Sequence, residues 1–444
     1  MRGFRASIKP AVAVMLGIAC FAGTARADGP RLVDHPDASW WLSADLDAIL
    51  MTQPGFHSPK AGAHSFSADD HVAGSFLTTV FAGYSPTSTT AIVVSGESTA
   101  GEALGDGRGL DAPLDDDLVR NPSLGAVPYI GQAFIEQVIP LTDNREPVVR
   151  TAVDLLQSEP SVRIEIRAGR LWAADLFETD RSSFRDVTIR HDGAWDSPAD
   201  ERGFAFGAVV DYIAPLWQLR FAELALPTTP RGGSYDLELS NAHGEAAQLT
   251  VHDCLYGHAG SIAIFGYMNH APMGSYGDAV AAVTIGQDET PDVTKYRLAG
   301  RNKRGVGLRI DQAITGDIHG FVGAGWSDGD TESFGPTEID NTVRMGVELN
   351  GSIWRRPSDG AGLGLATSGL SDVHRTYLAL GGIATVLGDG SLHDGRQTLV
   401  EGYYRLRVVR GVDAGVQVDL IEHPGFNVDR GPAIVGSLRV SARL

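Results

Sequence analysis

The chain is poor in cysteine, in positive charge and in long apolar runs, and each shortage excludes a class of protein. Only two of its 444 residues are cysteines, Cys20 and Cys254, so a disulfide framework is not expected. No stretch approaches about 18 consecutive apolar residues, so no transmembrane helix is expected. Lysine and arginine number 36 against 55 acidic residues, and this acidic balance argues against nucleic-acid binding, which needs a basic face.

Glycine, by contrast, is abundant, at 54 of 444 residues, or about 12% against a typical value of about 7%. Because glycine is unfavourable in helix interiors and common in turns and strand bends, the composition favours β structure. The apolar content of 43% and the charged content of 20% are typical of a folded protein. By length alone, two or three domains would be the default, since single domains usually stop growing near 250–300 residues, roughly.

The first 27 residues have the three parts of a secretory signal peptide. Basic residues lie within 2–9, an apolar segment covers 11–22, and Ala25-Arg26-Ala27 forms a small-x-small cleavage site. The apolar segment is too short to span a bilayer, which needs about 20 residues. Cleavage after Ala27 would remove four positive charges and no acids, which takes the formal charge from −19 to −23. The predicted organisation is a signal peptide over 1–27 and one domain over 28–444.

The rest of the sequence alternates with a period of two residues. In the segment 40–50 the even positions are apolar, while the odd positions include Trp41, Ser43, Asp45 and Asp47, which is typical of a strand with one apolar and one polar face. The same alternation recurs at 162–168, 343–350, 400–408, 412–420 and 434–444. Weaker strand candidates cover 72–84, 88–98, 129–140, 203–213, 216–226, 245–256, 259–268, 303–313, 318–328 and 359–369. Together these segments predict about 16 strands.

The long connections between the strands are polar or rich in glycine, so we expect loops rather than further domains. They cover 101–128, 175–202, 228–244, 271–302 and 371–397. Two architectures fit the alternation: a soluble β protein buries its apolar face, whereas a membrane barrel turns that face to lipid and lines a wet lumen with the polar one. The signal peptide, the mixed charges on the polar faces and the terminal strand ending at Leu444 favour the barrel.

Motifs between the strands resemble the carbohydrate-selective porin family of the OprB type. The segment Gln53–Phe66 is similar to an N-terminal motif of that family, and 167–177 followed by 200–204 is similar to a central one. The strongest similarity is C-terminal, in the segments 369–378, 381–382, 387–390, 401–404, 423–426 and 430–432. The resemblance covers nearly the whole chain after the signal peptide. It implies a passive channel for sugars in the outer membrane of a Gram-negative bacterium.

The sequence departs from the family pattern at a few positions. Lys60 stands where the family usually has an aromatic residue, and His64 stands where it usually has asparagine. The run 178–180 lacks the usual asparagine, and Leu444 replaces a common terminal aromatic residue. These departures bear on substrate preference more than on fold.

The polar strand faces carry the candidate functional residues, because in a barrel they would line the lumen. Opposed acidic and basic groups there can narrow the lumen and hydrogen-bond sugar hydroxyls, and arginine suits this with five donors in a fixed fork. Trp41 can stack on a sugar ring or mark a membrane boundary. The predicted pore-lining residues are Arg163, Glu165, Arg167, Arg344, Glu348, Glu401, Arg405, Arg407, Asp413, Gln417, Asp419, Arg439, Arg443, Asp45, Asp47 and Trp41.

Three other groups of residues have the atom types of a metal or catalytic site without its spacing. His57, His64 and His71 are seven residues apart on a turn-rich segment with no cysteine partner, so no metal is expected. Neighbours in the run 252–254 point to opposite faces of a strand. The run 371–374 holds serine, aspartate and histidine, but adjacent positions do not provide a triad geometry. We therefore expect no cofactor and no enzyme activity.

The sequence as a whole predicts an all-β transmembrane antiparallel barrel of about 16 strands with long outer loops, acting as a porin. Its expected partners are outer-membrane lipid, the barrel-assembly machinery, and small sugars and ions as transported solutes; nothing marks a subunit interface. Two alternatives stay open at this point. One is a channel selective for cations or divalent metals, supported by the acidic balance. The other is a soluble secreted β-rich protein that binds glycans.

Overall fold

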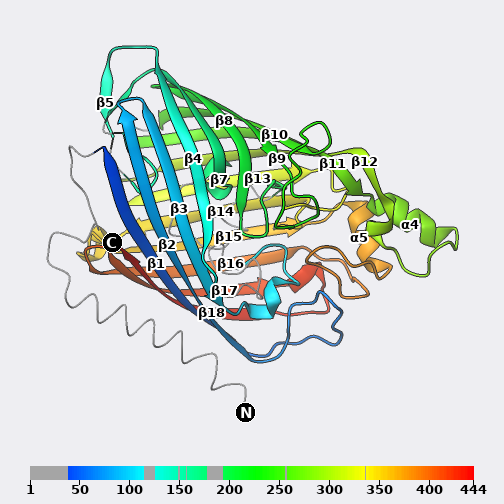
Figure 1. Ribbon diagram of the computed structural model, residues 1–444. Helices are drawn as coiled ribbons and strands as arrows, with labels where there is room; N and C mark the ends of the chain where they lie inside the picture. The colour runs from blue at the N-terminus through cyan, green and yellow to red at the C-terminus, as the bar shows by residue number, and fades with distance from the viewer. Residues whose placement is uncertain are drawn as a thin grey trace.

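The computed structural model describes residues 39–114, 126–148, 151–156, 158–177, 194–255, 258–335 and 337–444. The predicted signal peptide lies outside these residues. Sixteen strands close into one antiparallel barrel, in which each strand pairs with its neighbour along the chain and β1 pairs with β18 (Figure 1). This confirms the predicted fold class and the predicted number of barrel strands.

The barrel strands follow the predicted segments closely. They are β1 (Trp40–Gln53), β2 (His71–Thr87), β3 (Thr90–Gly101), β4 (Tyr129–Pro140), β7 (Arg163–Trp172), β8 (Phe204–Ala214), β9 (Trp217–Ala225), β10 (His243–Leu255), β11 (His258–Gly274), β12 (Arg297–Ala313), β13 (Ile318–Ser327), β14 (Asn341–Asn350), β15 (Gly360–Gly369), β16 (Gln397–Val409), β17 (Val412–Glu422) and β18 (Ala433–Arg443). A separate two-stranded sheet pairs β5 (Arg145–Pro147) with β6 (Ser158–Pro160).

The two ends of the barrel differ. Figure 1 shows the C-terminus and β5 at one end, which we call the turn end. The other end carries α4 (Tyr276–Thr284) and α5 (Asp372–Ala379), and we call it the loop end. The loop end also carries α2 (Ala174–Phe177) and the 3₁₀ turns η1 (Leu104–Gly107), η2 (Val293–Tyr296) and η4 (Pro424–Phe426), whereas η3 (Gly351–Trp354) lies in the β14–β15 turn. The described short turns, such as β2–β3 and β16–β17, lie at the turn end.

Two connections predicted as plain loops contain regular structure. In the segment 271–302, β11 runs on to Gly274, α4 follows, and β12 already begins at Arg297. In the segment 371–397, α5 begins after Ser371. Both helices start at a serine whose side chain accepts a backbone N–H of the first turn, from Asp278 after Ser275 and from His374 after Ser371. A period-two search does not detect these caps.

The apolar strand faces point outwards. Large apolar side chains on alternate positions of the strands remain exposed, for example Val416 at 51% and Val418 at 56%. Polar side chains on the intervening positions are buried inside the barrel, among them Glu165, Asp211 and Glu401. This is the inverse of a soluble protein and matches a barrel whose outer wall meets lipid. No helix among the described residues is long and apolar enough to cross a membrane.

Segments from the loop end fold back into the barrel and give it a core. Residues 194–200 are all buried, and so are the described residues of 331–340. Trp195, at 1% exposure, packs edge-on against Phe177 and Phe265, with ring centroids 5.3 and 5.6 Å apart. The described part of the interior is therefore partly filled by apolar side chains.

The outward orientation of Val418 leads to a stability prediction. Val418 lies near the middle of β17 and faces out, so Val418→Arg should destabilise the barrel in lipid by about 2–4 kcal/mol. The control is Gln417→Arg, one residue earlier on the inner face, where two carboxylates accept hydrogen bonds from Gln417. Urea unfolding in lipid vesicles measures both. Equal losses would contradict the assigned orientation of the wall.

Candidate functional site

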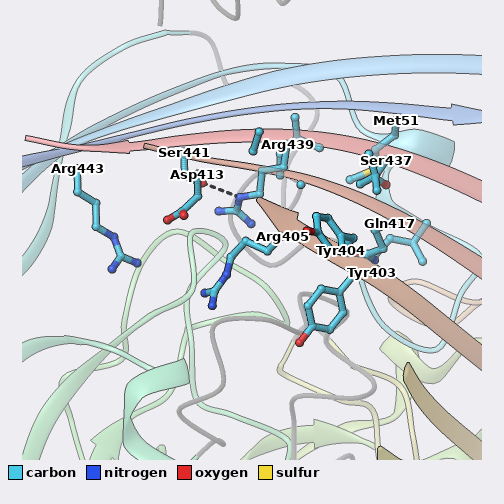
Figure 2. Close-up of a pocket in the computed structure, with 15 residues that line it drawn as sticks. Met51, Tyr403, Tyr404, Arg405, Asp413, Gln417, Ser437, Arg439, Ser441 and Arg443 are labelled. Carbon is cyan, nitrogen blue, oxygen red and sulfur yellow. Dashed lines mark hydrogen bonds between the residues drawn. The ribbon is translucent and has the colours of Figure 1, made fainter. Parts of the chain in front are cut away.

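An open cavity with about 80 Å³ of space for water-sized groups lies inside the barrel against β1, β16, β17 and β18 (Figure 2). Five predicted pore-lining residues surround it, Arg405, Asp413, Gln417, Arg439 and Arg443. The remaining lining residues are Ile49, Met51, Leu114, Tyr403, Tyr404, Ala414, Gly415, Val416, Ser437 and Ser441.

Strand alternation and glycine place the side chains that enter this cavity. Tyr403 and Arg405 are two residues apart on β16, so both point to the inner face. They pair with Gly362 and Gly360 of β15. A Cβ atom at Gly362 would lie 2.4 Å from the Tyr403 ring, and one at Gly360 would lie 3.3 Å from the Arg405 guanidinium. The missing Cβ at Gly362 therefore lets the Tyr403 ring lie against the wall.

Two of the basic side chains on this wall are neutralised by carboxylates. Arg439 Nη2 donates to Asp47 Oδ1 at 2.7 Å across the β1–β18 seam, and Ser441 Oγ donates to the same carboxylate. Arg407 Nε donates to Asp413 Oδ1 between β16 and β17. These pairs leave little unbalanced charge at their positions.

Arg405 and Arg443, in contrast, have no carboxylate partner within the part of the chain that the structure describes. The Nε atom of Arg405 is buried and has no hydrogen-bond partner there, and Arg443 is exposed at the turn end of β18. In Figure 2 both guanidinium groups extend away from the strands into the open space. The cavity therefore presents two unneutralised positive charges.

Arg163, Glu165 and Arg167 lie on another part of the wall, where they belong to an ion-pair network. Both arginines contact Glu165, at 3.5 and 3.4 Å. Arg167 also lies 3.7 Å from Asp211 of β8, which forms a 2.7 Å ion pair with Arg220 of β9. These inward-facing charges neutralise one another, and none of them lines the cavity of Figure 2.

The other predicted charges also point inwards and are largely covered. Arg344 is 1% exposed, and it lies against Gly323, where a Cβ atom would be 2.5 Å from its Nε. Glu401 and Asp419 are buried, and Gln417 Nε2 donates to them at 3.2 and 3.0 Å. Asp45 and Glu348 are half-buried on the inner faces of β1 and β14. Only part of the predicted set thus meets at the cavity.

The structure corrects the two roles suggested for Trp41. Its side chain lies on the inner face of β1, so it does not mark a membrane boundary. It is only 5% exposed and belongs to the apolar cluster that also holds Phe134 and Leu155, and its Nε1 donates to Ser43 Oγ at 3.2 Å. With its ring covered in this way, Trp41 does not offer a stacking surface for a sugar.

A loop from the β3–β4 connection covers the cavity on the side of the loop end. Leu104 and Leu110 pack against Ile49 of β1, and Leu114 lines the cavity itself. The carboxylate of Asp111 holds this loop to β15 and β16, because it accepts hydrogen bonds from Ser368 and Gln397. The alternation pattern carries no signal for this loop, whereas it would have identified Tyr403, Ser437 and Ser441 as inward-facing.

The three histidines of the N-terminal loop do not converge. His64 Nδ1 lies 2.7 Å from the carbonyl oxygen of Ala384 and so joins two loops, and burial lowers the pKa of His64. His71 lies near the loop end, beside a second hollow of about 220 Å³ that Ser65 and Arg108 also line. Among the described residues, no group of three or more metal-ligating side chains is arranged to hold a metal ion.

The serine, aspartate and histidine of 371–374 do not form a catalytic triad. His374 is buried, and its Nδ1 lies 2.9 Å from Asp340 Oδ2. Ser371 Oγ donates instead to the carbonyl oxygen of Gly329 and accepts the backbone N–H of His374. The His374 ring stacks on Tyr276, with centroids 4.2 Å apart. These residues fasten α5 to α4 and to the start of β14.

Comparison with known proteins agrees with this architecture. The model of the family "Carbohydrate-selective porin, OprB family" matches residues 131–444. The chain belongs to the OprB family of carbohydrate-selective porins. The porin is similar to a structure described as the high-pH structure of Pseudomonas putida OprB, with 14% sequence identity, a TM-score of 0.68, and coverage of 91% of this chain and 94% of that one.

A crystal structure of Pseudomonas aeruginosa OccK11 (OpdR) matches the porin with 10% identity, a TM-score of 0.46, and coverage of 91% of this chain and 96% of that one. A search of the curated proteins found no match. The family and the fold place the porin in the outer membrane of a Gram-negative bacterium. They are those of a non-enzymatic channel for small solutes, as the sequence predicts.

Proposed function

We propose that the porin conducts small carbohydrates by passive diffusion along the cavity lined by β1, β16, β17 and β18. The observation that carries this proposal is the lining itself: donors and acceptors of Arg405, Gln417, Ser437 and Ser441 surround one open space. Sugar hydroxyls both donate and accept hydrogen bonds, so such a lining can exchange contacts with them as they pass. Selectivity in a passive pore follows from its width and its lining groups.

We also propose that the porin is exported with cleavage after Ala27 and is inserted by the barrel-assembly machinery. Its outer wall would then contact outer-membrane lipid. The outward apolar wall supports the lipid contact. The alternative of a soluble glycan-binding protein does not fit that wall. The alternative of a cation or divalent-metal channel rests on the net charge of the chain, but the two unpaired charges in the cavity are positive.

Sugar uptake into vesicles tests this function. Purified porin in liposomes should admit monosaccharides at a rate that rises linearly with sugar concentration at low concentration and falls with sugar size from mono- to trisaccharide. Liposomes without porin provide the baseline. No uptake of any sugar above that baseline, together with a reversal potential that strongly favours cations, would contradict the proposal.

A further inference from the structure

Two arginines that line the cavity make no ion pair with a described carboxylate, although the chain as a whole is acidic. The chain carries 19 more acidic than basic side chains. At the cavity, however, Asp47 neutralises Arg439 and Asp413 neutralises Arg407. Arg405 and Arg443 then make no ion pair within the described residues, although Asp45 of β1 stands opposite Arg443 in the strand register. A solute in this cavity therefore meets two guanidinium groups that no described carboxylate contacts, and the low dielectric of the surrounding wall strengthens their charges relative to bulk water.

Arg405 offers free donors that point to the cavity. Its Nε is buried without a hydrogen-bond partner, although a buried unsatisfied donor costs free energy. Because Nε has almost no accessible surface, an incoming carboxylate would pair instead with the terminal Nη N–H groups, which favour a bidentate geometry. A neutral hydroxyl would bring no charge to this position. The unpaired guanidinium charge thus indicates an anionic group as the better ligand.

Tyr403 lies at a suitable distance to hold the rest of such a solute. Tyr403 and Arg405 share the inner face of β16 and are two residues apart, which is about 7 Å along a strand. The ring lies against Gly362 and lines the cavity. In Figure 2 both side chains extend to the same side of β16. One hexose ring on Tyr403 would place an attached carboxylate within reach of Arg405.

Arg443 offers a second position towards the turn end. Along β18 it lies four residues beyond Arg439, which is at the level of Arg405 because both flank Gly415. The two unpaired guanidinium groups therefore stand at successive heights of the same open path. An anion that leaves Arg405 meets Arg443 next.

From this geometry we infer that the porin favours sugars that carry a carboxylate, such as hexuronates and aldonates, over neutral sugars. Arg405 binds the carboxylate, Tyr403 contacts the sugar ring, and Arg443 receives the anion towards the turn end. This inference rests on the proposed function as a carbohydrate porin and names the substrate class of the same cavity.

Vesicle uptake of three sugars of similar size tests it: glucuronate, glucose and the cationic glucosamine. We expect glucuronate to enter fastest and glucosamine slowest, with a preference that weakens from low to high salt as the charges are screened. The double variant Arg405→Gln, Arg443→Gln should lower the ratio of glucuronate to glucose uptake roughly tenfold.

The matched control is Arg355→Gln, which removes one positive charge from an exposed arginine of the β14–β15 turn, outside the cavity. The control should keep the parent ratio of uptake. Equal uptake of glucuronate and glucose by the parent, or an unchanged ratio in the double variant, would overturn the inference and leave the carbohydrate porin standing. Failure of all three sugars to enter would overturn the proposed function, and the inference with it.

Discussion

Gly415→Trp should lower the single-channel conductance and the sugar uptake of the porin on the order of tenfold, which corresponds to an added barrier of about 1.4 kcal/mol. Gly415 lies on the inner face of β17 between Arg405 and Arg439, and it lines the cavity. A Cβ atom there would meet only the carbonyl oxygen of Tyr404, at 3.5 Å. The wall therefore tolerates a side chain at this position, and an indole ring would enter the open path.

Gly402→Trp is the matched control for this experiment. Gly402 pairs with Val418 on β16 and faces outwards, where a Cβ atom would lie 3.8 Å from Leu363. The same ring added there meets lipid rather than the lumen, so the conductance should stay at the parent value. Planar-bilayer recordings measure both variants. If Gly415→Trp conducted like the parent, the solute path would have to lie elsewhere in the barrel.

Asp340→Ala should weaken the attachment of α5 by roughly 1–3 kcal/mol, the usual loss when a buried hydrogen-bonding group is left unsatisfied. Asp340 is 2% exposed and lies 2.9 Å from His374 Nδ1, and it also accepts the backbone N–H of Ser371 at 2.8 Å. The Nε2 atom of His374 has no hydrogen-bond partner among the described residues. The alanine variant would thus leave the buried imidazole without a polar contact.

Hydrogen exchange of the α5 amides measures this loss as a lower free energy of local opening. The control is Asp372→Ala on the same helix, because Asp372 is exposed and pairs with the exposed Arg375. Surface pairs contribute roughly 0–1 kcal/mol, so this variant should open almost like the parent. Equal opening in both variants would mean that the Asp340–His374 pair does not hold the helix.

The same pair sets a pH dependence. Burial alone would raise the pKa of Asp340, but the charge and the hydrogen bond of His374 outweigh it, so the pKa lies below its usual value. A carboxyl with a lowered pKa contributes stability above its unfolded pKa, about 3.9, and loses it as the pH falls through the folded value. Protection of α5 should therefore decrease in acid, and Asp340→Asn should remove this part of the decrease.

The alternation of side chains predicted most of the barrel, because a strand in lipid must repeat its polar and apolar faces every two residues along its whole length. Strand β4 runs from Tyr129 to Pro140, the segment predicted for it. The same rule gave no information on 271–302 and 371–397, where serine caps start α4 and α5. It also could not detect that segments such as 194–200 turn back into the lumen and become buried.

The strand pattern predicts which side chains face inwards, but it does not predict which of them lie together. Alternation turns Arg163, Arg405 and Arg439 inwards alike, and it cannot distinguish them further. Their surroundings differ because Arg163 has Glu165 two residues away on its own strand β7, and cross-strand packing brings Asp47 of β1 to Arg439. Arg405, in contrast, pairs in register with Gly360 and Gly415. Trp41 shows the same limit, since the apolar cluster around it comes from segments distant in sequence.

The shortage of positive charge in the sequence determined what the protein is not, and the period of two determined that it is a barrel of about 16 strands with a polar interior. Only the tertiary structure decided where that polar interior carries net charge. The face of the wall to which a side chain points depends on its position in its own strand. The pairing of its charge depends on which neighbouring side chains lie within about 4 Å. An acidic chain can therefore enclose a cavity whose free charges, Arg405 and Arg443, are both positive.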